Sequence, residues 1–450
     1  MMRRRGLPLL MWVLVCWPGP LAAQAMGEGA AQAAVGETSP FVEALRSTIA
    51  LHPAVRGKTA EVSAKQAAGE GARAQRLPSL STQWAAQRGD GEDERPGSLR
   101  VRQPIWAFGR IDSEIARADA DHFAERMDLL RVQRQLLDQT VVAYVRAWGA
   151  RRRLQVGEEN VGELLALSER IQRRARGELA STADVRLAEA RLTQARVQRD
   201  RLDTEWQLAQ TELLALTQAP TDSAAPVPEA LLALGSGRGL PAWLNDAERV
   251  HADVRLAGER ARVAEAEIER ERRSGMPNVF LQAERSFNER ASSGQGDGTI
   301  YSVVLEAGLD NLGFATRGRV RGALSRHEAA LAERASTLNE VQRTMRSLYL
   351  QRETQQSMRE RQQQSVSEVS YLLASYQRQY EAGYKSWLDV LNMQRELTEQ
   401  RLLQVQAETD WQTYSLRLAT LVGAFDAHAG VEPPDEVAAA DPDAGLPWLP

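Results

Sequence analysis

The sequence predicts an elongated, mostly helical α+β protein in which two β-hairpins alternate with two pairs of long helices. Two observations are an internal duplication and, in each copy, stretches where polar and apolar residues alternate strictly. The third is a pair of helical stretches of roughly 65 residues without a breaker, which at about 1.5 Å per residue would be rods about 100 Å long. Rods of this length do not fold back inside one compact domain.

Composition excludes several classes of function. The 450 residues carry 56 basic and 60 acidic side chains, a formal net charge of -4. These charges are interspersed along helical stretches, as on solvated faces, so no nucleic-acid partner is expected. The sequence has no Gly-x-Ser-x-Gly motif and no phosphate-binding loop, and its five histidines lack metal-ligand spacing. We therefore expect no enzyme activity, no cofactor and no metal.

The N-terminal residues 1–25 are typical of a secretory signal peptide. Arg3–Arg5 are basic, Leu7–Trp17 are apolar, and Ala23-Gln24-Ala25 fits a cleavage site. Cleavage after Ala25 would remove Cys16, the single cysteine, and the bulky residues before Cys16 do not fit lipid attachment. No run of 18 apolar residues follows, so we expect an exported protein without a membrane-spanning helix.

Four sequence markers recur in the same order, which indicates a duplication. "HPAVR" at His52 returns as "HADVR" 199 residues later, and Pro78 returns as Pro277 at the same offset. Two further markers return at offsets of 209 and 205 residues; they are Gly109-Arg110 with Gly318-Arg319, and Asp184-Val185 with Asp389-Val390. We expect a first repeat at 26–219, a linker rich in Pro, Gly and Ser at 220–242, a second repeat at 243–425, and a disordered acidic tail at 426–450.

Each repeat is expected to run through the same elements. In the first, Ser39-Pro40 is a helix start, the helix runs to about Gln75, and a β-hairpin occupies about 79–106. Long helices follow, with a turn at 177–184. In the second repeat the hairpin lies at about 278–309 and the turn at 383–389. We expect the two histidines of the repeated motif to mark a junction between helices.

The predicted strands have about 9 to 10 residues, the length that crosses a bilayer at a tilt. Four strands from one chain leave two open edges, whose backbone groups cannot remain unpaired in lipid. Several chains closing one barrel would remove the edges, and a trimer would supply twelve strands.

These features resemble those of the TolC family of outer-membrane export ducts. The resemblance lies in "HPAV", "QPIWAFGR", "GELASTADVRLAEARL" and "YEAGYKSWLDVLNMQREL" and covers nearly all of the chain after the signal peptide. It implies a homotrimer with a 12-stranded β-barrel in the outer membrane of a Gram-negative bacterium and an α-helical coiled-coil tunnel in the periplasm. It also implies three kinds of partner: outer-membrane lipid, a periplasmic adaptor, and an inner-membrane ABC or RND pump. The expected function is a passive duct for type I protein secretion or small-molecule efflux; the alternative is a periplasmic coiled-coil adaptor or scaffold.

The two turns are the expected site. Gly177 and Gly383 are candidates for the left-handed residue that ends each descending helix. Ser181 or Thr182 can cap the first ascending helix, and Ser386 the second. For Asp184 and Asp389 two readings stand. A carboxylate in the first turn of a helix stabilises it by about 0.3–1 kcal/mol, whereas the resemblance implies an acidic ring at a periplasmic aperture.

The resemblance assigns further residues to this aperture. It implies that Tyr380 latches the closed mouth by bonding to Asp184 of a neighbouring turn; the alternative is a residue of the helix seam. Lys385 matches a second latch donor, but Ala183 stands where its acceptor threonine is expected. Two alternatives follow: this latch is absent, or it is rewired to Thr182. Asn392 replaces a second acid of the ring. Trp84, Trp106 and Tyr301, near the strands, suit either a membrane-interface belt or ordinary packing.

Overall fold

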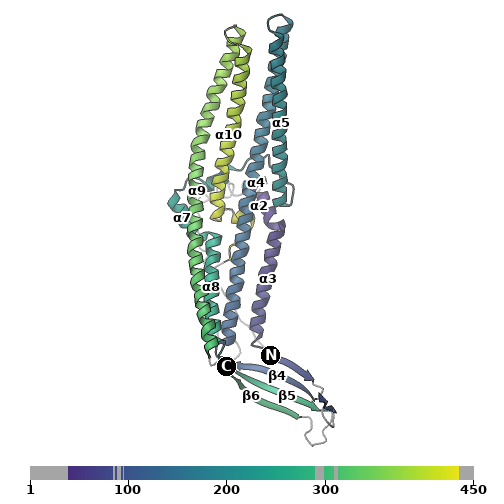
Figure 1. Cartoon of the computed structure of the whole chain (residues 1–450), viewed down its shortest axis with the longest axis vertical. Coiled ribbons are helices and arrows are strands. Elements are labelled where there is room, and N and C mark those ends of the chain that lie inside the picture. Colours follow the sequence, from purple (N-terminus) through teal and green to yellow (C-terminus); the bar gives the residue numbers. More distant parts are fainter. Residues whose placement is uncertain are drawn as a thin grey trace, which may run out of the picture.

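The computed structural model describes residues 39–84, 87–88, 93–94, 96–288, 298–308 and 313–434. Helices form a long rod, and a small sheet lies at one end of it (Figure 1). The expected signal peptide and most of the acidic tail lie outside the described residues. The helices are α2 (Pro40–Leu51), α3 (Pro53–Ala74), α4 (Arg110–Arg176), α5 (Thr182–Thr217), α6 (Glu229–Leu234), α7 (Leu240–Val250), α8 (Ala252–Arg273), α9 (Phe314–Glu381), α10 (Trp387–Leu421) and α11 (Asp426–Ala429).

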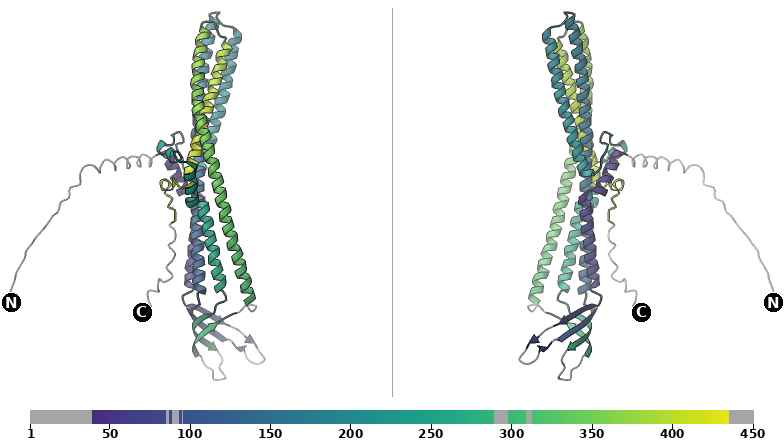
Figure 2. Two further views of the ribbon diagram at one scale, coloured as in Figure 1. Left: turned by 90° about the vertical axis from the view of Figure 1, so that its left-hand side faces the viewer. Right: turned by 90° about the vertical axis from the view of Figure 1, so that its right-hand side faces the viewer.

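Two helical hairpins form the end of the rod opposite the sheet. α4, of 67 residues, turns back as α5, and α9, of 68 residues, turns back as α10. The shorter α3 and α8 run beside the other halves of α4 and α9, toward the sheet (Figures 1 and 2). The prediction of a mostly helical protein with two long helical pairs is confirmed.

The duplication is visible in how the helices begin. His52 and His251 each cap a helix, accepting a hydrogen bond on Nδ1 from the backbone N–H two residues on, at 3.2 Å in both. The helix expected from Pro40 to about Gln75 is therefore broken at His52, whose ψ of 130° is not helical. The expected equivalence of Gly109 with Gly318 is wrong. Gly109 and Gly313 have φ near +80° before α4 and α9, whereas Gly318 lies inside α9.

The main sheet has four antiparallel strands in the order β1-β4-β5-β6. They are β1 (Ser79–Trp84), β4 (Pro96–Trp106), β5 (Asn278–Asn288) and β6 (Gly298–Glu306), and a two-residue pair, β2 (Gln87–Arg88) with β3 (Asp93–Glu94), extends the first hairpin. β4 of the first repeat pairs with β5 of the second. The edges of the sheet are therefore β1 and β6, at opposite sides of the same chain.

Midway along the rod, a core joins both repeats and the linker. Phe41 contacts Tyr144 and Phe425 edge-to-face, at 5.2 and 5.9 Å between ring centroids. The Tyr144 hydroxyl donates to carbonyls of the linker at 3.0 and 3.2 Å. A Cβ on Gly235 would lie 2.0 Å from the Ser415 carbonyl oxygen of α10. The segment expected as a plain linker thus contains α6 and packs directly against the long helices.

Composition predicts a disordered tail from residue 426 onward, but residues 426–434 are folded against the long helices. They contain α11, and the Asp426 carboxylate pairs with the Arg134 guanidinium of α4 at 2.7 Å. Both side chains are buried, and Arg134 also donates to the Val250 carbonyl at 2.5 Å. A buried charge needs a partner, so this acidic residue is held in the fold by the arginine beneath it.

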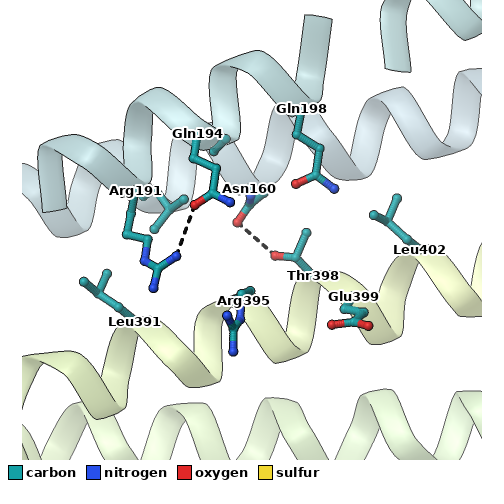
Figure 3. A pocket seen from close by; sticks show the side chains of 11 residues that line it. Asn160, Arg191, Gln194, Gln198, Leu391, Arg395, Thr398, Glu399 and Leu402 are labelled. Carbon is teal, nitrogen blue, oxygen red and sulfur yellow. Dashed lines mark hydrogen bonds between the residues drawn. The ribbon is translucent and has the colours of Figure 1, made fainter. Parts of the chain in front are cut away.

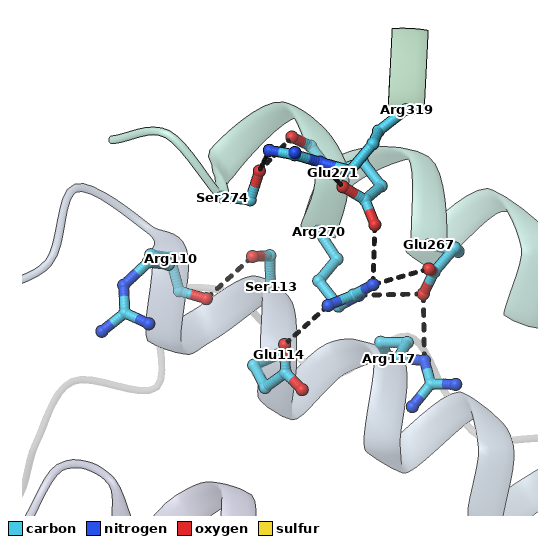
Figure 4. A network of polar contacts seen from close by, with 9 residues as sticks. All are labelled: Arg110, Ser113, Glu114, Arg117, Glu267, Arg270, Glu271, Ser274 and Arg319. Carbon is cyan, nitrogen blue, oxygen red and sulfur yellow. Dashed lines mark hydrogen bonds and ion pairs between the residues drawn. The ribbon is translucent and has the colours of Figure 1, made fainter. Parts of the chain in front are cut away.

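Where the helices meet the sheet, ion pairs join three helices (Figure 4). Glu267 of α8 accepts from Arg117 of α4 at 3.0 Å and from Arg270 at 2.7 Å. The buried Glu271 then binds Arg319 of α9 at 3.1 Å. The network ties α4, α8 and α9 together next to the strands that precede and follow them.

None of the helices in the described part of the chain is both long and apolar enough to cross a membrane.

Candidate functional site

Both turns begin their ascending helix with the same hydrogen-bonded box. Asp184 N–H donates to the Ser181 hydroxyl at 3.1 Å, and the Asp184 carboxylate accepts from Ser181 N–H at 3.3 Å. Ser386 and Asp389 make the same bonds at 3.2 and 3.0 Å. Each aspartate therefore has a structural role in a capping box, in which it is the third residue of the helix (N3). The expected caps at Ser181 and Ser386 are present in the structure.

The Asp389 box is linked to pH. Hydrogen bonds from the Ser386 hydroxyl and N–H, and then the charge of Lys385, hold the pKa of Asp389 below its usual value. A lowered pKa in the folded state means that the carboxylate stabilises the turn above its ordinary pKa. This contribution is lost as the pH falls through the lowered value.

The descending helices end in matching Schellman turns, with hydrogen bonds of 2.9 Å from Leu179 N–H to Arg174 O and 2.8 Å from Tyr384 N–H to Gln379 O. Gly383 has the expected left-handed φ of +84°, but Gly177 has a φ of −91°. In the first turn Glu178 takes the left-handed position, with a φ of +57°. The expectation for Gly177 is therefore wrong by one residue.

Tyr380 lies on the seam between the two hairpins. Its ring packs on Trp387 at 5.3 Å, and the Arg174 guanidinium of α4 lies 4.9 Å from its centroid. Burial raises the pKa of the Tyr380 hydroxyl; Arg174 opposes this shift and the nearby Asp184 carboxylate adds to it. The hydroxyl therefore stays protonated and able to donate. Within one chain, Tyr380 packs with the apolar cluster of the hairpins, and the Asp184 carboxylate is bonded to Ser181.

Lys385 and Asn392, the other two residues expected at the aperture, both belong to the second helical hairpin. Lys385 places its Nζ 4.4 Å from the centre of the Tyr376 ring, within its own hairpin. Asn392 is half-buried one turn further along α10 than Asp389. The structure thus brings Asp184, Tyr380, Lys385 and Asp389 to the same end of the rod. Sequence reasoning missed Arg174 and Trp387, which both contact the Tyr380 ring. Trp387 could have been found from its position directly after the Ser386 cap, whereas no sequence signal pointed to Arg174.

Below this end, a groove of about 370 Å³ is lined by α4, α5 and α10 (Figure 3). At its base, the buried Thr398 hydroxyl donates to the Asn160 side chain at 2.9 Å. The contact between the two hairpins therefore includes a polar layer beside the apolar cluster.

At the opposite end of the molecule, one face of the sheet is mostly apolar; its charged residue in the described part of the strands is Arg285, which lies opposite Leu99 with its guanidinium 5.4 Å from the centre of the Phe287 ring. Trp84, Gly97 and Phe287 are neighbours across three strands, and the rings of Trp84 and Phe287 stack at 6.3 Å above Gly97. Trp106 lies nine residues beyond Gly97 along β4, and its ring stacks on that of Phe108 with 5.0 Å between the ring centroids. Between these aromatic pairs lie exposed aliphatic residues and Tyr301; the aliphatic residues include Leu80, Leu281, Val303 and Leu305.

In the part of the chain that the structure describes, no cluster of His, Cys, Asp or Glu is arranged to hold a metal ion.

Comparisons with known proteins identify the family. The model of the family "Outer membrane efflux protein" matches residues 243–424, within the second repeat. Protein CyaE of Bordetella pertussis is 30% identical over 344 residues, covering 70% of this chain and 68% of that protein. The chain belongs to the outer membrane efflux protein family.

Solved structures share the TolC-like fold of this chain. The outer-membrane channel OprN superimposes with a TM-score of 0.70 at 19% identity, covering 86% of this chain and 91% of that chain. The open-state MtrE outer-membrane channel of Neisseria gonorrhoeae gives a TM-score of 0.70 at 16% identity, covering 85% and 88%. A membrane protein from Pseudomonas aeruginosa gives 0.73 at 20% identity, covering 86% and 90%.

Membership of this family decides several expectations. As a member of this family, the protein is an outer-membrane channel with its helical tunnel in the periplasm, and it is a passive duct, not an enzyme. The alternative of a periplasmic adaptor or scaffold is set aside, because the fold of this protein is that of the outer-membrane channels. Two strand hairpins that alternate with two helical pairs agree with this outcome.

The unequal turns give a first prediction. Glu178 is a non-glycine residue in a left-handed conformation, which costs roughly 1 kcal/mol, so Glu178→Gly should stabilise the first turn. Hydrogen exchange of the turn amides should slow by about fivefold. Gly383→Ala should speed exchange in the second turn, whereas Gly177→Ala is the control and should have little effect. Equal effects at the two glycines would contradict this assignment.

Proposed function

We propose that three copies of this chain close a 12-stranded barrel in the outer membrane and that the helices form one tunnel below it. The observation that carries this proposal is the sheet, with its apolar face and two open edges. In lipid, unpaired edge groups cost several kcal/mol each, so the edges must pair. β1 and β6 run antiparallel to each other, so β6 of one copy can extend the antiparallel sheet at β1 of the next.

The apolar face supports a position in the membrane. Nine residues along β4 separate its two aromatic pairs, about 30 Å at 3.3 Å per residue. At the tilt of barrel strands this matches an apolar band about 25 Å tall between aromatic girdles. Trp84 and Trp106 suit the two girdles, whereas Tyr301 lies within the band. This supports the belt reading for the two tryptophans only.

We propose type I protein secretion as the transport class, with small-molecule efflux as the alternative. In such a system the partners are a periplasmic adaptor and an inner-membrane ABC transporter. An RND pump is the corresponding partner for efflux. The residues Val13–Val15 before Cys16 support an unlipidated channel, and the cargo is the decisive test between the two transport classes.

A deletion strain separates the two classes. Cells that lack this protein should stop secreting the protein exported by the partner ABC transporter, because a duct has no substitute path across the periplasm. A plasmid copy should restore secretion, and susceptibility to dyes and antibiotics should not change. Normal secretion together with raised drug susceptibility would establish efflux instead.

At the periplasmic end, we propose that Tyr380 and Asp184 of neighbouring turns hold the closed aperture. Each polar contact contributes about 0.5–1.5 kcal/mol, and a trimer repeats it three times. Losing all of them shifts a two-state aperture substantially. Lys385 and Asp389 lie at the same mouth. Because Asn392 stands in place of a second acid, the proposed acidic ring carries less negative charge.

This latch predicts a change in conductance. Tyr380→Phe with Asp184→Ala should leave the trimer intact and raise single-channel conductance in planar bilayers, because the mouth stays open. The matched control is Ser386→Ala, which removes the equivalent cap in the second turn but leaves Tyr380 and Asp184 in place, so conductance should not rise. Lower trimer stability with unchanged conductance in the first variant would show that these residues only cap and pack.

A further inference from the structure

The polar face of the sheet carries a ladder of paired charges at the boundary between the two repeats. Arg100 of β4 lies directly opposite Glu284 of β5. Its Nε and Nη2 each donate to one carboxylate oxygen of Glu284, both at 3.1 Å. This fork-to-fork geometry is the strongest form of the arginine–carboxylate pair.

The ladder continues to the edge strand. Arg102 donates to the Gln282 side chain at 2.8 Å and reaches Glu306 of β6 at 3.6 Å. Gln282 in turn donates to Glu284 at 3.0 Å, and its own side chain is enclosed, with 8% of the residue exposed. Two arginines and two glutamates are thus joined across β4, β5 and β6.

The ladder lies on the face opposite the apolar one, because side chains alternate along a strand. Leu99, Val101 and Leu281 point to one side, and Arg100, Arg102 and Gln282 to the other. If the apolar face meets lipid, as the proposed function requires, the ladder lines the passage. Three copies then place six arginines and six glutamates in one section of the wall, with no net charge.

Pairing changes what these side chains do to a passing molecule. A ring of free guanidinium groups would bind carboxylates and phosphates, and a conduit works only where binding is weak enough for cargo to leave. Each Arg100 instead has both donors of its fork occupied by Glu284. The wall therefore presents alternating charges that already satisfy one another.

We propose that the Arg100–Glu284 pair, supported by Arg102 and Glu306, keeps the wall of the barrel section neutral, so that this section does not discriminate between cations and anions. This inference rests on the proposed barrel. Charge discrimination then falls to the periplasmic end, where Asp184 and Asp389 lie. Removing either member of the pair should charge the wall, with opposite signs for the two members.

Reversal potentials in a KCl gradient across planar bilayers test this. Glu284→Gln should lower the ratio of potassium to chloride permeability by at least about twofold, and Arg100→Gln should raise it by a similar factor. The charge-exchanged variant Arg100→Glu with Glu284→Arg should restore the ratio of the unaltered channel. Unchanged selectivity in both single variants would overturn the proposal, as would equal shifts in the same direction.

A second readout uses tripolyphosphate as a probe of exposed arginine. It should block Glu284→Gln channels from the side of the barrel, and it should block neither the unaltered channel nor the charge-exchanged variant. Should Glu284→Gln fail to assemble, Glu306→Gln is the substitute, since Glu306 lies more exposed at the edge. If the unaltered protein itself formed no channel, the proposed barrel would fail; a channel with unaltered selectivity in the variants would overturn the ladder alone.

Discussion

The structure depends on the unpaired edges of β1 and β6. A four-stranded sheet with one apolar and one polar face is unstable alone in water and in lipid, because two rows of backbone groups lack partners. In the proposed trimer, closure with further copies pairs the edges, gives the apolar face to lipid and encloses the charged ladder. The helices that enter and leave the strands must then continue on one side as a tunnel.

The duplication supplies this architecture from one supersecondary unit used twice. Each repeat contributes a hairpin of strands and a hairpin of helices, and the contact of β4 with β5 joins them in the sheet. In the helical part the joint is made by α4 and α10, by the docked linker, and by the buried pair of Arg134 with Asp426. The ends differ in character: the sheet end is joined by strand pairing and ion pairs, whereas near the turns the two helical hairpins meet in an apolar cluster and a few polar contacts.

Much of the fold could be predicted because its signals are local and long. Strict alternation predicts strands, unbroken helical stretches predict rods, and Ser followed by Asp three residues later predicts a capped helix. The errors occurred where one backbone angle decides. Gly177 attracted the left-handed assignment because glycine favours it, yet register placed Glu178 there. His52 does mark the expected junction between helices, but its side-chain cap divides the helix expected to run unbroken from Pro40 to about Gln75. The sequence assigns Asp426 to the disordered acidic tail because its partner, Arg134, lies 292 residues away in sequence. The ladder was also beyond reach, since strand register is needed to place Arg100 opposite Glu284.

Disulfide cross-linking between the two edge strands tests the central claim directly. Within one chain, two strands separate β1 from β6, a distance of about 14 Å at 4.8 Å per strand, whereas a disulfide needs Cα atoms within about 7 Å. Ser81→Cys can be combined in turn with a cysteine at Ile300, Ser302 or Val304, all on the polar face. After oxidation in native outer membranes, at least one pair should give a covalent trimer that resists denaturation and reverts to monomer on reduction. Monomers with free thiols for every pair would show that the edges of neighbouring chains do not meet.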